Sequence, residues 1–207
     1  MSGQQALEQM SPRKREIITS IASAFAARGY HAVGMRELAQ ELGLNQGTLY
    51  HHFPSKDHAL LAICLVGQHE THNNVAQTLA SEAGFQRRVE KLFEAHLSSL
   101  DRLGDFIDVF ASQRDAVPVA LAEPLREGWL ETRRLFIRLF DEAIAARDIA
   151  PDTDTQNARR LLLAIYRSAN ILHRTNRQDQ TGPFVSTAMQ IMLHGLVAHS
   201  PVSGRSS

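Results

Sequence analysis

Apolar residues recur every three or four positions along most of the chain, which is the spacing of helices with one buried face. Between residues 12 and 28, for example, Ile17, Ile21 and Phe25 fall on one face, and strand-like alternation is nearly absent. Glycine and proline interrupt the pattern and mark helix ends. We therefore predict an all-α protein of about nine helices, over residues 12–28, 35–42, 46–53, 56–80, 85–102, 105–115, 124–147, 155–176 and 183–199.

Two short helices, at 35–42 and 46–53, are separated only by a tight turn and follow a longer helix. Gly43 suits the left-handed backbone of such a turn, and Asn45 is a favourable N-cap for the helix after it. This arrangement indicates a helix-turn-helix, whose second helix can enter the major groove of DNA. The apolar residues expected to hold the two helices at their crossing are Leu38, Ala39, Leu44 and Leu49.

Polar residues at the start of the second short helix would face the groove. We expect Gln46 to pair with an adenine edge and Thr48 to touch a thymine methyl group or a phosphate, while Gly47 allows close approach. Helix N-termini add amide donors for phosphate oxygens. Taken singly, Gln46 or Thr48 is more often a solvated surface residue, but the flanking pattern favours DNA. The predicted DNA-binding residues are Met35, Arg36, Gln46, Gly47, Thr48, Tyr50, His51 and Lys56.

Residues 13–61 resemble the DNA-binding domain of the TetR family of bacterial transcription regulators. The resemblance rests on IASAFAARGY and on MRELAQELGLNQGTLYHHFPSKDHALL, above all on its part GTLYHHFPSKD. It implies that Lys56 contacts the DNA backbone and that Tyr50 packs and donates to a phosphate. One departure is Val33-Gly34, where the family usually has Thr or Ser as a cap that contacts phosphate. In a second departure, Asn45 stands where Ser is common, and this substitution preserves the cap of the helix at 46–53.

The helix pattern and the resemblance together divide the chain. We expect a DNA-binding domain at 11–56 and a larger effector-binding and dimerisation domain at 57–199. Residues 1–10 and 200–207 are polar and are predicted to be disordered tails.

The resemblance also implies that the larger domain forms a homodimer. The helices at about 155–176 and 183–199 place small residues among large apolar ones, which suits a four-helix bundle between subunits. A dimer would place two reading helices roughly 34–36 Å apart, so that they match half-sites of a palindromic double-stranded operator.

A small-molecule effector is the other partner that the resemblance implies. The stretch EGWLETRRLFIRLFDEAIAARDIAPDTD is similar to family members that respond to acyl-CoA thioesters, so an acyl-CoA is one candidate. Its phosphates would need cations, and Arg114, Arg126, Arg133 and Arg134 are available, although surface arginines are common. Its acyl chain would need an apolar pocket, although aromatic residues in a helical domain more often belong to the hydrophobic core than to a pocket. The candidate pocket residues are Phe106, Phe110, Trp129, Arg133, Tyr166 and His173.

Charge and composition modify this interpretation only slightly. The chain has 22 basic and 22 acidic residues, and residues 1–60 hold six against five, a net +1, which predicts moderate salt dependence. A single cysteine, Cys64, excludes an intramolecular disulfide and fits the cytoplasm. The sequence shows no signal peptide or membrane-spanning run, and no phosphate loop or nucleophile elbow. We therefore expect neither an enzyme nor a cofactor nor a membrane partner.

Two other functions are compatible with the sequence. One is a helical small-molecule-binding protein without specific DNA binding. The other is a metal-responsive regulator that uses His69 and His72, which share a helical face but lack an evident third ligand, so solvated histidines are favoured. The main prediction is a ligand-responsive repressor that a small molecule releases from DNA.

Overall fold

The computed structural model describes residues 1–81, 84–175 and 178–196, and every element in them is a helix. This confirms the predicted all-α fold. The order along the chain is α1 (Gly3–Glu8), α2 (Pro12–Arg28), α3 (Met35–Glu41), α4 (Gln46–His52), α5 (Lys56–Leu79), α6 (Phe85–Gln113), the short 3-10 helix η1 (Arg114–Ala116), α7 (Glu123–Ala145), α8 (Thr155–Arg174) and α9 (Gln178–Leu196).

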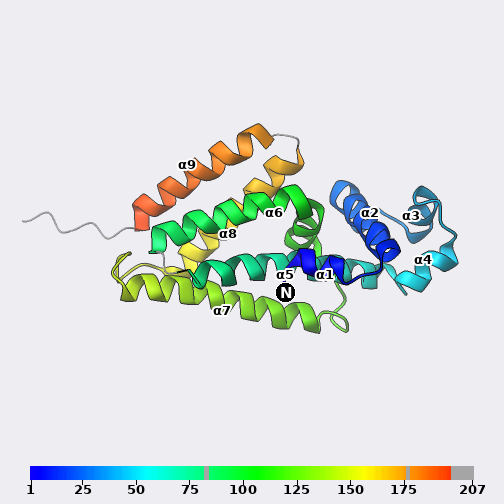
Figure 1. The fold of residues 1–207 in the computed structure, drawn as a ribbon, viewed down its shortest axis with the longest axis horizontal. Helices are drawn as coiled ribbons and strands as arrows, with labels where there is room; N and C mark the ends of the chain where they lie inside the picture. The colour runs from blue at the N-terminus through cyan, green and yellow to red at the C-terminus, as the bar shows by residue number, and fades with distance from the viewer. Residues whose placement is uncertain (82–83, 176–177, 197–207) are drawn as a thin grey trace, which may run out of the picture.

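Helices α2, α3 and α4 form a small cluster at one end of the molecule, and α5 to α9 form a larger bundle beside it (Figure 1). Helix α5 begins in the small cluster and continues into the bundle, where it packs against α6 and α7. Helix α8 lies against α6, and α9 covers α8. Because α5 belongs to both parts, it is a direct mechanical link between them.

The N-terminal residues form a helix, so the predicted disordered tail at 1–10 is wrong. Ser2 and Gln5 make a capping box at the start of α1. The Gly3 N–H donates to the Glu70 carboxylate over 3.0 Å, and Leu7 is buried. The sequence pattern missed α1 because its partners lie far along the chain, and a six-residue helix is unstable without them.

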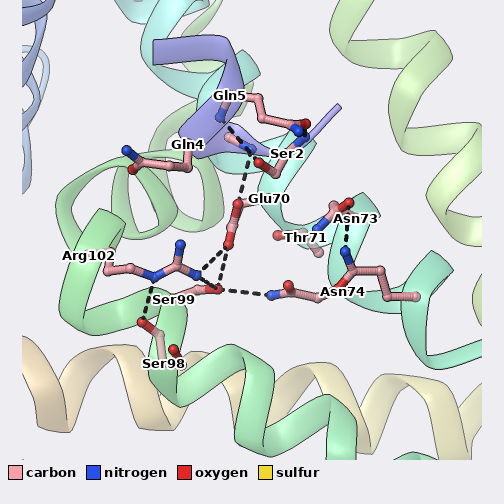
Figure 2. Close-up of polar contacts among 12 residues, drawn as sticks. Ser2, Gln4, Gln5, Glu70, Thr71, Asn73, Asn74, Ser98, Ser99 and Arg102 are labelled. Carbon is pink, nitrogen blue, oxygen red and sulfur yellow. Dashed lines mark hydrogen bonds and ion pairs between the residues drawn. The ribbon is translucent and has the colours of Figure 1, made fainter. Parts of the chain in front are cut away.

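Glu70 is the centre of a buried polar network that joins α1, α5 and α6 (Figure 2). Besides the Gly3 amide, its carboxylate accepts hydrogen bonds from the Ser99 hydroxyl (2.7 Å) and the Arg102 guanidinium (3.0 Å). Asn74 in turn donates to the Ser99 oxygen over 3.1 Å. Burying a carboxylate costs free energy because it loses its hydrogen bonds to water, and each of these donors offsets part of that cost for Glu70.

Helix α6 also differs from the prediction. The helices expected at 85–102 and 105–115 are one helix, Phe85–Gln113, with a kink at Leu103 (φ −134°, ψ 22°). Gly104 follows the kink without ending the helix, because Ser99 before the kink and Phe106 after it both contact α5. The count of nine α-helices nevertheless holds over the described residues, since α1 replaces the helix lost by this merger.

Helix α9 begins five residues earlier than predicted, at Gln178 instead of 183, and contains Pro183. Pro183 is the sixth residue of α9, so it removes the hydrogen bond that an N–H at this position would donate to the carbonyl of residue 179, and sequence reasoning therefore placed the helix start at the proline. Residues 197–199 of the predicted helix and the predicted tail at 200–207 lie outside the described residues.

Gly67 allows α5 and α6 to approach closely. A Cβ at this position would lie 2.5 Å from the Phe106 carbonyl oxygen and 2.8 Å from the Phe110 Cβ. In Gly67→Ala, overpacking of about 1–3 kcal/mol opposes a gain in helix propensity of up to about 1 kcal/mol. We expect urea unfolding to show a net loss of about 1 kcal/mol. Gly182→Ala is the matched control, because nothing lies near its Cβ; equal effects of the two substitutions would contradict the close packing.

Candidate DNA-binding site and effector cavity

The turn between α3 and α4 ends the first helix by backbone hydrogen bonds. Gly43 has φ 61°, the left-handed conformation expected for it. Its N–H donates to the Gln40 carbonyl over 3.1 Å, and the Leu44 N–H donates to the Ala39 carbonyl over 2.8 Å. This pair of bonds is a Schellman motif, which fixes the direction in which the chain leaves α3.

Apolar side chains hold the two helices together at the positions that the sequence indicated. Leu38, Ala39 and Leu49 are buried, and Leu44 packs against the same core. The Asn45 side chain then caps α4, accepting a hydrogen bond from the backbone N–H of the third residue after it over 2.7 Å. These contacts fix the angle at which α4 presents its outer face.

The outer face of α4 is polar. Thr48 is half-buried, and its hydroxyl donates to the Asn45 oxygen over 2.9 Å, so the methyl group and the oxygen lone pairs are left for other contacts. Tyr50 is 45% exposed although it follows the buried Leu49. The exposed residues of this face are Gln46, Gly47, Tyr50 and His51.

The start of α3 presents a backbone rather than a side-chain cap. The Gly34 N–H donates to the Glu37 carboxylate over 3.3 Å, and Gly34 itself has no side chain that could cap the helix. Arg36 is exposed. Met35, however, is buried, so its side chain is not available for contacts outside the protein. A DNA contact by Met35 must therefore be a main-chain contact.

Lys56 lies at the N-terminus of α5, and an aromatic ring positions it. Its Nζ is 4.3 Å from the centre of the Tyr30 ring, and the Tyr30 hydroxyl bonds to the Asp57 carboxylate. Burial, and then the bond to Asp57, raise the pKa of Tyr30 to about 12, while burial lowers the pKa of Lys56. The phenol is thus a neutral donor at physiological pH and supports the ammonium group above it.

Several cations near this site are already occupied. Arg28 pairs with Glu37 at 2.6 Å and with Glu41 at 2.7 Å, which ties α2 to α3. Arg15 donates to the carbonyls of Leu7 and Glu8 at the end of α1. The positive charge that can act on DNA therefore comes from few residues, consistent with the small net charge of residues 1–60.

A cavity of about 290 Å³ lies in the bundle among α5, α6, α7 and α8. Three of the predicted effector residues, Phe110, Trp129 and Tyr166, line it. So does Arg114, whose guanidinium stacks 4.8 Å from the centre of the Trp129 ring. The structure thus brings together three of the predicted aromatic side chains and one of the candidate arginines.

The other three predicted pocket residues do not line this cavity. Phe106 lies where α6 meets Gly67 of α5, and it borders a separate, more polar cavity at the bend of α6. His173 borders that second cavity as well. Arg133 is exposed on α7. Phe106 and Phe110 both follow the kink at Leu103 and both lie against Gly67 of α5, and sequence spacing could not show that only Phe110 reaches the cavity.

Sequence reasoning missed much of the wall that α6 and α8 contribute. His96 stacks flat on Tyr166, with ring centres 4.1 Å apart, and its Nε2 lies 2.9 Å from Asn170 Oδ1. Burial lowers the pKa of His96 to about 4, so this imidazole is neutral at physiological pH. Arg160 and Arg167 also line the cavity, and their seven-residue spacing was a signal in the sequence.

Of the two histidines considered for metal binding, His72 has another partner. His72 Nδ1 lies 3.1 Å from the Thr132 hydroxyl, and His69 is half-buried. Within the described residues, no group of three or more His, Cys, Asp or Glu side chains could hold a metal ion. Cys64 is buried, and burial raises the pKa of its thiol to about 12, as expected for an inert core thiol.

Direct hydrogen bonds join the DNA-binding helices to the bundle. The Gln113 side chain, at the end of α6, donates to the Phe25 carbonyl (2.9 Å) and accepts from the Tyr30 N–H (2.6 Å). Arg174, at the end of α8, donates to the Ala26 carbonyl over 3.0 Å. The C-terminal end of α2 is therefore held by two helices of the bundle, and a shift of either helix would displace it.

None of the described helices has both the length and the apolar character required to cross a membrane.

Comparison with known proteins agrees with this geometry. The family model for bacterial regulatory proteins of the tetR family matches residues 17–63, which include α3 and α4. The transcriptional activator FasR of Mycolicibacterium smegmatis is 29% identical over 89 residues, covering 43% of this chain and 41% of FasR. The transcriptional repressor KstR2 of Rhodococcus jostii is 25% identical over 156 residues, covering 73% of this chain and 75% of KstR2.

The fold is shared over nearly the whole chain with a solved structure. The ketosteroid transcriptional regulator KstR2 of Mycobacterium tuberculosis superposes with a TM-score of 0.79 at 19% identity, covering 92% of this chain and 98% of the other. The fold, the helix-turn-helix and the matched residues agree with one another. Residues 17–63 of this chain thus match the tetR family of bacterial regulatory proteins, and they identify the protein as a DNA-binding transcriptional regulator of the tetR type.

Proposed function

We propose that this regulator is a repressor that binds a palindromic operator as a homodimer and leaves it when a small molecule occupies the bundle cavity. The observation that carries the proposal is the exposed polar face of α4, held at a fixed angle by the buried Leu38, Ala39 and Leu49. A helix with an exposed polar face, held in place by a packed apolar core beneath it, is suited to contact base edges in the major groove.

Within this proposal, the residues at the α4 N-terminus divide into two groups. Gln46, Gly47 and Thr48 read or approach bases, and Tyr50 and His51 reach phosphates. Arg36, the Met35 amide and Lys56 add backbone contacts from the flanking helix starts. In this scheme the DNA-binding domain spans 11–56 and the effector-binding and dimerisation domain spans 57–199, with α1 packed against the latter.

Exposed apolar side chains on α8 and α9 support the homodimer. Leu161 and Ile171 on α8 are about half exposed, and Ile191 on α9 is 69% exposed. On α9, Ile191 lies on the same face as Gly195, around which there is open space for close helix approach. Exposed apolar side chains of this kind become buried when a partner subunit packs against them.

Effector release follows from the contacts between the cavity and α2. Arg114 lines the cavity, and its neighbour Gln113 holds the Phe25 carbonyl and the Tyr30 amide. Thr71 of α5 also lines the cavity, and α5 begins at Lys56, about 22 Å away at 1.5 Å per residue. A ligand that favours a shifted α5 and α6 would change the separation of the two α4 helices and so favour release.

One candidate effector is an acyl-CoA thioester, whose acyl group would enter the cavity while its nucleotide stayed outside. The cavity of about 290 Å³ is of a size for a single apolar group. A chromosomal target places the regulator in the cytoplasm, where its DNA is. FasR and KstR2, the relatives compared above, are named as transcriptional regulators, which is consistent with a role without catalysis.

The test is fluorescence anisotropy of the full chain against a pool of labelled promoter fragments, with light scattering of the same sample. We expect one fragment to bind in clear preference to random DNA, at a stoichiometry of two chains per site. A folded protein that binds no fragment above background would overturn operator binding. A monomeric protein that still binds one fragment tightly would overturn the homodimer alone.

Gln113→Ala should weaken the coupling between cavity and reading helix. The substitution removes two hydrogen bonds to α2, each worth about 1 kcal/mol, and leaves the cavity wall in place. We expect operator affinity to change by about tenfold or less, and the effector-induced loss of affinity to shrink. Operator titrations with and without effector measure both, and Gln77→Ala, on the exposed side of α5, is the control.

A further inference from the structure

The cavity lining is apolar inside and positively charged at its rim. Ile107, Phe110 and Trp129 form apolar walls, whereas Arg114, Arg160 and Arg167 also line the space. Among the described residues that line it, none is Asp or Glu. Three cations around an apolar cavity with no acidic side chain create a site that attracts negative charge.

These arginines are only weakly neutralised by the protein. Arg160 donates to the Asn157 amide oxygen over 2.9 Å, which adds no negative charge. Arg114 has Asp115 at 3.7 Å, but that carboxylate is almost fully exposed. Arg167 has no carboxylate partner within the described part of the chain. Guanidinium groups on exposed positions remain free to pair with an incoming anion.

A fourth arginine adds to the same field. Arg159 lies beside Arg160 and faces Arg133 of α7, and burial together with repulsion from these two cations lowers its pKa. Such clustering costs free energy in the empty protein and is relieved when an anion binds.

The cavity also contains a polar group without a partner. The Tyr166 hydroxyl is buried and has no hydrogen-bond partner among the described residues, and Tyr166 lines the cavity. The neighbouring His96 Nε2 and Asn170 Oδ1 pair with each other over 2.9 Å, and neither of these atoms bonds to the Tyr166 hydroxyl. Because a buried hydroxyl normally has a hydrogen-bond partner, a polar atom of a ligand in the cavity could supply the partner that the Tyr166 hydroxyl lacks.

We infer that this cavity selects an organic anion: an apolar body of modest size among the aromatic walls, with its acidic group at the rim formed by Arg114, Arg160 and Arg167. The inference rests on the proposed effector role of the cavity and specifies the chemistry of the effector. The acidic group is a carboxylate or a phosphate, which guanidinium groups bind in the same bidentate manner.

Trp129 provides a direct measurement of binding, because it is the single tryptophan of the chain and lines the cavity. We would titrate the full chain with three probes that share one apolar body: cyclohexylbutanoate, cyclohexylbutyl phosphate and the neutral cyclohexylbutanol. We expect the better of the two anions to change Trp129 fluorescence with at least about tenfold higher affinity than the alcohol. The stronger anion identifies the acidic group.

Substitutions locate the effect at the rim. Arg167→Gln should reduce affinity for the preferred anion about tenfold and leave affinity for the alcohol unchanged. Arg134→Gln, an exposed arginine of α7 that does not line the cavity, is the matched control and should change neither. Equal affinities for alcohol and anions, or a loss of anion binding in both variants, would overturn the inference.

The same samples separate this inference from operator binding. Anisotropy on the promoter fragment without any probe reports whether the regulator binds DNA. A protein that binds its operator but shows no preference for anions contradicts the anion selectivity alone. A protein that prefers anions in the cavity yet binds no fragment contradicts the operator proposal and leaves the cavity chemistry standing.

Discussion

Replacing both Tyr50 and Lys56 with alanine should reduce operator affinity by at least about a hundredfold. In a dimer the double substitution removes four proposed phosphate contacts, each worth about 1 kcal/mol or more. The salt dependence should also weaken, because each lysine lost from a phosphate lowers the slope of log affinity against log salt by about one. Anisotropy at several salt concentrations measures both quantities.

The structure defines the control for this experiment. Lys91→Ala removes a lysine from α6, in the bundle, and should change neither affinity nor salt slope. Because Lys56 lies over the Tyr30 ring, urea unfolding must show that the double variant is still folded. A folded double variant with wild-type affinity would show that α4 and the start of α5 do not face DNA.

Glu70→Ala should destabilise the fold by about 3 kcal/mol. The substitution leaves the buried Gly3 amide and the buried Ser99 hydroxyl without their acceptor, and each unpaired group costs about 1–3 kcal/mol. It also opens space where a buried side chain was. Arg102 is about half exposed and can turn to water, so its loss adds little. Urea unfolding monitored by circular dichroism measures the change.

Glu94→Ala is the matched control for Glu70→Ala. Glu94 lies on α6, which packs against α5, but its side chain is exposed. Its pair with Arg87 at 3.1 Å is a surface ion pair, which contributes little to the free energy of unfolding. Glu70→Gln adds a sharper comparison, because its NH₂ group would face donors rather than accept from them. If Glu70→Ala were as stable as Glu94→Ala, α1 would not dock through this carboxylate.

The two kinds of site differ in how much the sequence revealed. The DNA-binding surface is local: Gly43, Asn45 and the leucines around them lie within about one dozen residues, and their backbone geometry follows from residue type. The cavity is assembled from four helices separated along the chain. Periodicity found Phe110, Trp129 and Tyr166 as apolar positions, but His96 and Asn170 had no local signature of a pocket.

The same distinction explains the wrong predictions. Residues 1–10 look disordered because their composition is polar, and the docking of α1 depends on Glu70 of α5 and on the space left by Gly3. Gly104 looks like a helix end, yet packing against α5 keeps α6 continuous through its kink at Leu103. Local propensity is a weak signal when tertiary contacts are extensive.

By itself, therefore, the sequence determined the helical class, the helix-turn-helix and its caps, because these depend on contacts among neighbouring residues. Only the tertiary structure decided where α1 lies, which aromatic residues share a cavity, and that Arg114, Arg160 and Arg167 meet at its rim. Those features depend on the angles and close approaches of helices distant in sequence, which side-chain packing over the whole bundle fixes.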